Sequence, residues 1–271
     1  MIELEFNQKT IENAIHTKWA GKTVHFAEVT DSTNLWAKEL ARNGASHGTL
    51  VAAELQTAGR GRLGRKWLSP AGSCIMMSLL LRPEFAPQYA PMLTLVMGLS
   101  MAQAIKKLGM EHSEVAIKWP NDAVVSGKKI CGILTEMSLE GTSIREVVIG
   151  VGINVNLSEV EEEIKDVATS LYLETGMKYD RSQIINLVMQ QFEINYEKYI
   201  RTLDLTYLVE EYNNLLINKD RQVRVLDPKE PFEGIARGIN KQGELLVECE
   251  DGEIAAVGAG EVSVRGLYGY V

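Results

Sequence analysis

Hydrophobic positions recur along this chain with two spacings. Short apolar or alternating runs bounded by turn residues are typical of strands, and longer stretches with one apolar face are typical of helices. In the first 220 residues the predicted strands lie at 23–29, 50–55, 73–81, 115–118, 123–125, 128–137 and 147–156. The predicted helices lie at 10–19, 35–41, 92–108, 181–201 and 204–217. Helices and strands are therefore interspersed, which favours a mixed domain in which helices flank a sheet.

The turns between the later strands fix their relative direction. The Pro-Asn-Asp sequence at residues 120–122 ends one strand and begins a loop. A Ser-Gly pair at residues 126–127 lies between two apolar runs and is a hairpin signal, and residues 140–143 make a further turn. Because strands joined by such short turns run antiparallel, we expect a mixed, largely antiparallel sheet with flanking helices. The expected fold class is α+β.

The pattern changes at Arg221. Five short apolar runs, separated by turn residues, follow at 222–226, 232–239, 245–249, 254–257 and 262–265. This spacing predicts a small β-barrel appended to the mixed domain. We therefore divide the chain into a large domain of residues 1–220 and a small domain of residues 221–271.

Composition narrows the classes of function. The chain has 271 residues and a net charge of −8, which argues against broad binding to nucleic acid. No segment has the pattern of a signal peptide or of a membrane span, so we expect no membrane role. The three cysteines are far apart, which is typical of reduced residues in a cytoplasmic protein. The four histidines show no metal-ligand spacing, so we expect no zinc site.

Against this acidic background, the segment Gly59-Arg60-Gly61-Arg62-Leu63-Gly64-Arg65-Lys66-Trp67 is a glycine-rich loop with four cationic side chains. Glycine lets a backbone adopt positive φ and approach a ligand closely. The planar guanidinium group of arginine matches carboxylate and phosphate oxygens. The loop is therefore a candidate site for an anionic ligand.

Three known glycine-rich motifs do not fit this loop. The dinucleotide-binding motif needs a helix at its last glycine, whereas the chain continues here as Trp-Leu-Ser-Pro at residues 67–70. A P-loop needs Lys and Ser or Thr directly after its last glycine, and Arg65 follows here. The kinase loop needs later His-Arg-Asp and Asp-Phe-Gly sequences, which do not occur. A solvated basic loop without a ligand is the structural alternative.

The loop is one of several motifs that together resemble the biotin protein ligase family. The others are Lys118-Trp119-Pro120-Asn121-Asp122, Lys129 with Gly132-Ile133-Leu134, and Gly150-Val151-Gly152-Ile153-Asn154, in the order and spacing of that family. The resemblance covers about residues 24 to 271. It implies an α+β catalytic domain of the class II aminoacyl-tRNA synthetase and biotin ligase type at residues 1–220, followed by an SH3-like barrel at residues 221–271.

The resemblance implies a two-step reaction that uses biotin, ATP and Mg²⁺. The biotin carboxylate attacks the α-phosphate of ATP to give biotinyl-5′-adenylate, and a lysine of the biotin carboxyl carrier protein of acetyl-CoA carboxylase then takes the biotinyl group. Lys129 and Arg62 are the implied catalytic residues. Two anions about 4 Å apart repel by roughly 4 kcal/mol at an effective dielectric of about 20, so cations must offset this term before the attack.

The other implied contacts fall into two groups. A ureido ring presents one acceptor and two donors, which hydroxyl and amide side chains can match. The residues that resemble contacts to the biotin head are Ser32, Thr33, Asn34 and Gln56. Those that resemble the closing loop and the nucleotide side are Gly59, Arg60, Gly61, Arg62, Arg65, Trp67, Asn121, Asp122, Lys129, Gly132, Gly150 and Asn154. Of these, Asp122 and Asn154 are the implied Mg²⁺ ligands.

The resemblance also bears on partners. It implies a homodimer, formed through the sheet that carries residues 147–155. Some family members carry a helix-turn-helix before the catalytic domain, but only about twenty residues precede the first predicted strand, so we expect no specific binding to DNA. Two alternatives stay open. One is lipoate protein ligase, and the other is a non-catalytic module that binds nucleic acid or another anionic partner through the basic loop.

Overall fold

The computed structural model describes residues 5–65, 67, 69–110, 114–227, 230–259 and 263–266. Its strands form a large sheet and a small sheet. The large sheet consists of β1 (Val24–Thr30), β2 (Leu50–Gln56), β3 (Cys74–Leu81), β4 (Val115–Lys118), β5 (Asp122–Val125), β6 (Lys128–Glu140) and β7 (Ser143–Asn154). The small sheet consists of β8 (Arg221–Leu226), β9 (Phe232–Ile239), β10 (Leu245–Glu248), β11 (Ile254–Val257) and β12 (Ser263–Gly266).

The strands of the large sheet have the order β1-β2-β3-β7-β6-β5-β4. β1 and β2 are parallel, and every other neighbouring pair is antiparallel. The predicted mixed, largely antiparallel sheet is therefore confirmed. The hairpin of β6 and β7 extends beyond the short strand β5. Among the described residues, no strand pairs with the outer edge of β6 from Leu134 onward.

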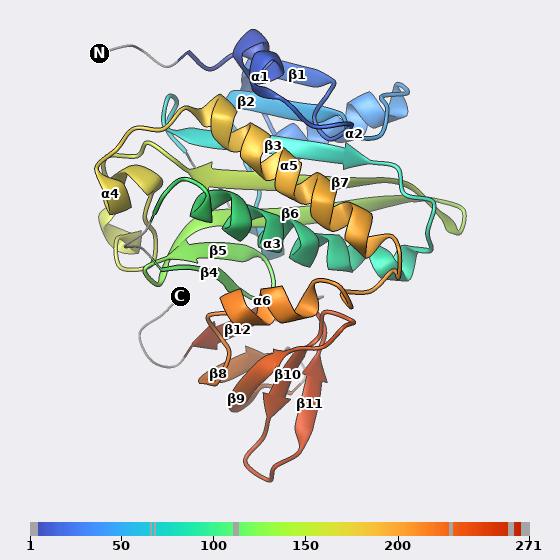
Figure 1. Ribbon diagram of the computed structural model, residues 1–271, viewed down its shortest axis with the longest axis vertical. Helices are drawn as coiled ribbons and strands as arrows, with labels where there is room; N and C mark the ends of the chain where they lie inside the picture. The colour runs from blue at the N-terminus through green and yellow to red at the C-terminus, as the bar shows by residue number, and fades with distance from the viewer. Residues whose placement is uncertain are drawn as a thin grey trace.

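Helices cover both faces of the large sheet. They are α1 (Gln8–Ala14), α2 (Thr33–Arg42), α3 (Leu93–Lys106), α4 (Leu171–Thr175), α5 (Arg181–Tyr199) and α6 (Val209–Leu215), with the 3₁₀ helices η1 (Arg62–Gly64), η2 (Pro87–Met92) and η3 (Glu162–Ile164). Figure 1 shows α3 and α5 lying across one face. α3 is buried along nearly its whole length, as its apolar sequence predicts. On the opposite face, α2 packs against β2, β3 and β7.

Two predicted helices are shorter in the structure. The first ends at Ala14, because the N–H of His16 donates to Asn186 Oδ1 and those of residues 18–20 donate to the Glu193 carboxylate, both on α5, instead of continuing the helix. The last was predicted at residues 204–217 and is reduced to α6. Turns and bends occupy the segment before it, where Leu205 N–H donates to Lys241 O at 2.7 Å. In both places a contact distant in sequence competes with the local helical pattern.

The small sheet lies beyond the β4 edge of the large sheet (Figure 1). Its strands have the order β11-β10-β9-β8-β12 and are antiparallel throughout. The indole of Trp119 is fully buried, and its N–H donates to Gly243 O at 3.1 Å, which links the two sheets. The structure thus confirms an α+β fold with a small C-terminal β module.

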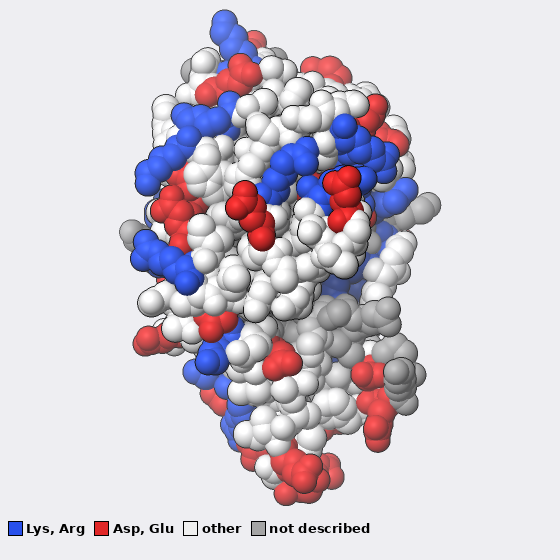
Figure 2. Space-filling model, turned by 90° about the vertical axis from the view of Figure 1, so that its right-hand side faces the viewer, with Lys and Arg blue, Asp and Glu red and all other residues white. Residues whose placement is uncertain are grey.

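The surface carries mixed charge. Figure 2 shows basic and acidic side chains interspersed over one face, with acidic ones at the free end of the small sheet. In the part of the chain that the structure describes, no helix is long and apolar enough to cross a membrane. Cys74 and Cys131 are buried, Cys249 is half-buried, and all three are free thiols.

Candidate active site

A pocket opens on the face of the large sheet that also carries α2. The space in and over it that is free of protein atoms, open solvent included, is about 1040 Å³. Its floor comes from β3, β6 and β7, and its walls from the start of α2, the glycine loop, the β4–β5 turn and β12. The C-terminal β module therefore contributes to the wall, through Val264.

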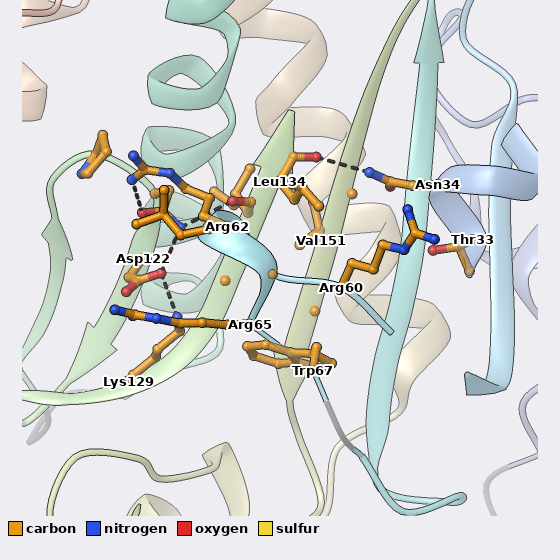
Figure 3. A pocket seen from close by; sticks show the side chains of 18 of the residues that line it. Thr33, Asn34, Arg60, Arg62, Arg65, Trp67, Asp122, Lys129, Leu134 and Val151 are labelled. Carbon is orange, nitrogen blue, oxygen red and sulfur yellow. Dashed lines mark hydrogen bonds and ion pairs between the residues drawn. The ribbon is translucent and has the colours of Figure 1, made fainter. Parts of the chain in front are cut away.

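The glycine loop folds across the mouth of this pocket (Figure 3). Two backbone hydrogen bonds close it, from Trp67 N–H to Gly59 O at 3.0 Å and from Gly61 N–H to Arg65 O at 2.7 Å. Lys66 lies outside the described residues. Figure 3 shows the Arg60 side chain directed toward Thr33 and the Arg65 side chain extended toward Lys129, whereas Arg62 reaches the β4–β5 turn. The loop thus supplies cations to both ends of the pocket.

Glycines on the pocket floor make room for Trp67. A Cβ atom added at Gly132 would lie 2.9 Å from Trp67 Cζ3, and one added at Gly152 would lie 2.5 Å from Trp67 Cε2. Both distances are too short for real atoms, so the indole can rest on β6 and β7 only because these two strands carry glycine there. The indole nitrogen Nε1 of Trp67 is buried and has no hydrogen-bond partner among the described residues.

Arg62 bridges two parts of the molecule. Its Nη1 donates to Asn121 Oδ1 at 2.9 Å in the β4–β5 turn, and its Nη2 donates to Ala259 O at 3.1 Å in the C-terminal module. Burial lowers the pKa of the Arg62 guanidinium, the negative charge of Asp122 raises it, and the positive charge of Arg65 lowers it further. An anionic ligand in the pocket would favour the charged form of this group.

Lys129 and Asp122 form an ion pair at the same end. Lys129 Nζ lies 2.7 Å from Asp122 Oδ1 and 5.6 Å from the centroid of the Trp67 ring. The backbone of Lys129 is fixed by two hydrogen bonds of 2.9 Å, from its N–H to Val167 O and from Thr169 N–H to its own carbonyl. The ammonium group is therefore held at the pocket, next to Arg62 and Arg65.

At the other end, hydroxyl and amide side chains surround the start of α2. Gln56 Oε1 accepts hydrogen bonds from Thr33 N–H at 2.7 Å and from Thr33 Oγ1 at 3.0 Å. Ser32 is the N-cap residue of α2, but its hydroxyl makes no capping hydrogen bond. A polar, uncharged ligand group could use these donors and acceptors.

Behind them lie residues that the sequence analysis missed. Ser78 Oγ is 2.6 Å from Asn34 Oδ1, Asn34 Nδ2 donates to Glu136 Oε2 at 2.7 Å, and Lys38 Nζ is 2.6 Å from Glu136 Oε1. Burial raises the pKa of Glu136, but hydrogen bonds from Lys38 and Asn34 outweigh burial and hold it below its ordinary value. The only sequence signal was a serine within the otherwise apolar run of β3, and nothing local marks Glu136.

The structure brings most of the predicted site residues together. Those that line the pocket are Ser32, Thr33, Asn34, Gln56, Arg60, Gly61, Arg62, Arg65, Trp67, Asn121, Asp122, Lys129, Gly132 and Gly150. Gly59 and Asn154 do not line it. Gly59 packs against the carbonyl of Trp67, and Asn154 Nδ2 donates to Thr169 O at 3.0 Å.

The donor set for a metal ion is sparse. Among the described residues there is no group of three or more His, Cys, Asp or Glu side chains that could hold a metal, and His112 lies outside them. Asp122 is the one carboxylate in the described lining of the pocket. A single carboxylate suits Mg²⁺ that arrives with a polyphosphate, because that ion keeps water and phosphate oxygens as its other ligands.

Two family models match the sequence. The model of the biotin/lipoate A/B protein ligase family matches residues 26–154, and the model of the biotin protein ligase C-terminal domain matches residues 220–265. The chain is 40% identical over 252 residues to the bifunctional ligase/repressor BirA of Bacillus spizizenii, covering 92% of this chain and 76% of that protein. It is 34% identical over 238 residues to the biotin–acetyl-CoA-carboxylase ligase of Mycobacterium tuberculosis, covering 86% of this chain and 85% of that protein.

A solved structure agrees with these matches. The biotin protein ligase from Aquifex aeolicus in complex with biotin and ATP superimposes with a TM-score of 0.78 and 34% sequence identity, over 90% of this chain and 99% of that chain.

Proposed function

This chain belongs to the biotin protein ligase family, and we propose from that premise how its pocket carries out the reaction. The protein activates biotin with ATP to biotinyl-5′-AMP and transfers the biotinyl group to a lysine of the biotin carboxyl carrier protein of acetyl-CoA carboxylase. The observation that carries the mechanism is the division of one pocket into a mainly neutral polar end, which Arg60 also approaches, and a cationic end that holds Arg62, Arg65 and Lys129. Biotin has a neutral ureido ring and an anionic carboxylate, and the two ends match them.

In the first step, the carboxylate oxygen forms a bond to the α-phosphorus of ATP and the bond to the pyrophosphate oxygen breaks. Both reactants are anions, so their approach is opposed by charge repulsion. Lys129 is the residue that offsets it. Its ammonium group lies 2.7 Å from Asp122 and lines the same pocket as Arg62 and Arg65, so these cations can offset the charge of one phosphoryl group.

The other roles follow the two ends of the pocket. Ser32, Thr33, Asn34 and Gln56 bind the biotin head, and Arg60 with Gly61 closes over it. Arg65, Trp67, Asn121 and Asp122 form the nucleotide side. Gly59, Gly132 and Gly150 act through the room that they leave, because each lies against Trp67 or Asn34.

Mg²⁺ enters with ATP as part of the substrate. Asp122 provides one oxygen ligand, and the phosphates and water provide the others. Asn154 is the second candidate ligand. Its Oδ1 is 3.7 Å from Cys74 Sγ and its amide nitrogen is bonded to Thr169, so it has to turn to reach the ion.

In the second step, the acceptor lysine attacks the acyl carbon of the adenylate, the new C–N bond forms, the bond to AMP breaks and the amine loses a proton. A mixed anhydride reacts with water and with any amine, so it must be enclosed until the carrier protein arrives. The glycine loop is the enclosing element.

Residues 1–220 form the catalytic domain, and residues 221–271 form a second domain that Arg62 holds against it. The three free thiols of the protein favour a cytoplasmic location.

The proposed homodimer forms through the large sheet. β7 itself has a partner on each side, so its edges are occupied. The outer edge of β6 beyond Ile133 is open in the described chain, and the nearby side chains of Met137 and Leu139 are 38% and 50% exposed. An open strand edge flanked by exposed apolar side chains is suited to pairing with a second copy.

The experiment that tests the function is exchange of labelled pyrophosphate into ATP. We expect exchange with biotin and none with lipoate at the same concentration. Equal exchange with lipoate would assign the protein to the lipoate branch, and no exchange with either acid would favour a non-catalytic module. Transfer is tested by adding purified carrier protein and measuring biotin on its acceptor lysine.

A further inference from the structure

A path of polar side chains leads away from the biotin end of the pocket, and the reaction described above gives it no role. Ser78 is fully buried on β3, with its hydroxyl 2.8 Å from Thr33 Oγ1 and 2.6 Å from Asn34 Oδ1. Asn34 Nδ2 donates to Glu136 Oε2 at 2.7 Å, and Lys38 Nζ lies 2.6 Å from Glu136 Oε1. Side chains of α2, β3 and β6 are thereby joined.

The carboxylate at the end of this path determines which groups donate. An ionised Glu136 can only accept hydrogen bonds, so Asn34 must turn its NH₂ group toward Glu136 and its oxygen toward Ser78. The reverse orientation of Asn34 would bring two acceptors face to face. Ser78 has one hydroxyl proton and two neighbouring oxygens, Asn34 Oδ1 and Thr33 Oγ1. When Ser78 donates this proton to Asn34, the lone pairs of the Ser78 oxygen face Thr33.

Thr33 connects this path to the pocket. Its hydroxyl lies between Ser78 Oγ at 2.8 Å and Gln56 Oε1 at 3.0 Å. Because the Ser78 proton is directed to Asn34, Thr33 gives its own proton to Ser78. The lone pairs of Thr33 Oγ1 are then available to a ligand. A hydroxyl prepared in this way accepts a hydrogen bond from an N–H group, and a ureido ring presents two such groups.

We propose that Ser78 and Glu136 are positioning residues for biotin: together they fix the hydrogen-bond direction of Asn34 and Thr33, so that Thr33 accepts from a ureido N–H. This inference rests on the proposed function, in which the neutral end of the pocket receives the biotin head. Neither residue touches the ligand in this scheme. Each acts through Asn34 or Thr33.

Two further contacts support a fixed geometry. A Cβ atom added at Gly150 would overlap Asn34 Oδ1, so the amide is packed directly on the β7 backbone and has little freedom to rotate away. The side chains of Lys38 and Glu136 are 18% and 27% exposed, so their ion pair is partly shielded from water. Hydrogen bonds to ionised groups are among the stronger ones in proteins, and losing one lowers affinity by about tenfold.

The test is calorimetric binding of biotin in the absence of ATP. The variants are Ser78→Ala, Glu136→Met and Glu136→Gln, with Glu140→Gln on an exposed part of β6 as the matched control. We expect Ser78→Ala and Glu136→Met to bind biotin about tenfold more weakly. Glu136→Gln keeps an acceptor oxygen and should recover most of the affinity, while the control should match the wild type. Desthiobiotin, which keeps the ureido group but lacks the thioether ring, should show the same losses.

Pyrophosphate exchange separates this role from a general structural one. We expect the KM for biotin to rise in the two weak variants, with the KM for ATP unchanged. Wild-type affinity in both, or equal rises in the two KM values, would overturn the inference while leaving the proposed function intact. If the wild type itself binds no biotin, the proposed function fails first. Should Ser78→Ala not fold, Ser78→Cys keeps the shape with a weaker donor and is measured instead.

Discussion

At the scale of single residues, the proposed function assigns the first chemical step to Lys129. We expect Lys129→Ala to fold normally and to lose synthesis of the adenylate by a factor of about 100 or more, because one well-placed charge is worth about 3 kcal/mol in a transition state of this kind. The measurements are biotin-dependent pyrophosphate release and thermal unfolding. Lys128→Ala is the control, because Lys128 Nζ donates to Lys165 O at the exposed surface. Near-normal pyrophosphate release by Lys129→Ala would contradict the role assigned to Lys129 in adenylate synthesis.

Arg62 should affect retention of the adenylate more than its synthesis. The residue holds the loop to Asn121 and Ala259, while Lys129 remains in place to offset charge. Charge-assisted hydrogen bonds contribute roughly 1.5–3 kcal/mol each, so Arg62→Gly should weaken retention by about tenfold to a hundredfold.

This variant should therefore label bystander proteins. Incubation with biotin, ATP and serum albumin, followed by a blot for biotin, measures the release. Equal labelling by wild type and variant, or a variant that makes no adenylate, would show that Arg62 does not act as the latch.

The two glycines of β7 allow a matched comparison. A methyl group at Gly150 would overlap Asn34, whereas one at Gly152 would overlap the indole of Trp67. We expect Gly150→Ala to raise the KM for biotin and Gly152→Ala to raise the KM for ATP, each by about tenfold or more, because different walls of the pocket must move. Initial rates of pyrophosphate release at varied biotin and varied ATP measure both. The same pattern in the two variants would contradict this division of the pocket.

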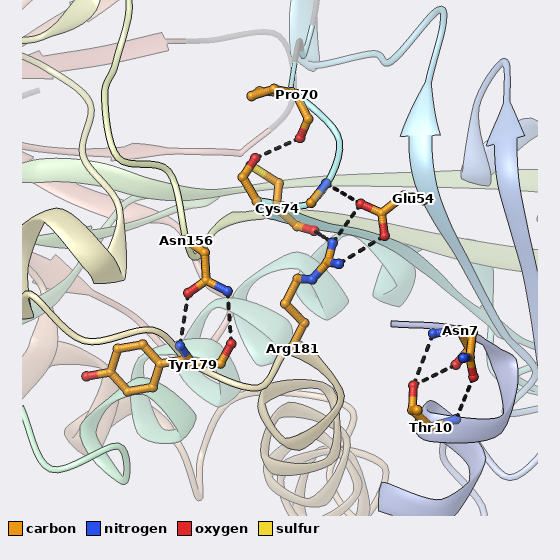
Figure 4. A network of polar contacts seen from close by, with 10 residues as sticks. Asn7, Thr10, Glu54, Pro70, Cys74, Asn156, Tyr179 and Arg181 are labelled. Atoms are coloured by element: carbon orange, nitrogen blue, oxygen red, sulfur yellow. Dashed lines mark hydrogen bonds and ion pairs between the residues drawn. The ribbon is translucent and has the colours of Figure 1, made fainter. Parts of the chain in front are cut away.

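At the scale of elements, a buried ion pair ties the turn that precedes β3 to the scaffold. Arg181, at the start of α5, donates to both carboxylate oxygens of Glu54 at 2.9 Å and to Cys74 O at 3.0 Å (Figure 4). Its guanidinium also lies 4.1 Å from the ring centroid of Phe6. Glu54, on β2, accepts from Gly72 N–H, so β2, α5 and the turn before β3 meet at one carboxylate.

Breaking this pair should cost stability, since it leaves a buried charge alone. We expect Arg181→Met to lower the free energy of unfolding by about 3 kcal/mol, and the double variant Glu54→Met, Arg181→Met to recover part of the loss. Arg237→Met is the control, because Arg237 is 39% exposed and its surface pair with Glu248 should contribute less than about 1 kcal/mol. Urea unfolding measures all three. A loss no larger than that of the control would refute the buried role.

At the scale of the whole molecule, the open edge of β6 should govern self-association. We expect the wild type to form dimers in sedimentation equilibrium and Met137→Lys to remain monomeric, because a lysine on an open edge opposes strand pairing. Ile194→Lys, which changes an exposed side chain on α5 at the other face of the sheet, should dimerise like the wild type. A monomeric wild type at all concentrations, or a dimeric Met137→Lys, would exclude this interface.

The sequence by itself determined the strands and the small C-terminal module, and it predicted a set of site residues of which most line one pocket. Strand runs bounded by turn residues depend on local chemistry. A short turn such as that at residues 126–127 lets the two strands it joins pair only in the antiparallel direction. The site residues could be predicted because they occur in contiguous motifs, in which glycine and arginine spacing is itself the signal. Thr33, Gln56, Arg62 and Lys129 do line one pocket.

Only the tertiary structure decided which residues from other elements contact the predicted site residues. The first helix stops at Ala14, and two side chains far along the chain accept the N–H groups that follow: Asn186 accepts from His16, and Glu193 accepts from residues 18–20. Only the structure shows that Asn154, which the family resemblance assigns to the nucleotide side, does not line the pocket and donates to Thr169 O. Ser78 and Glu136 act on Asn34 across three elements that are separate in sequence. Such contacts are fixed by how helices and strands pack, and a one-dimensional pattern carries no record of that geometry.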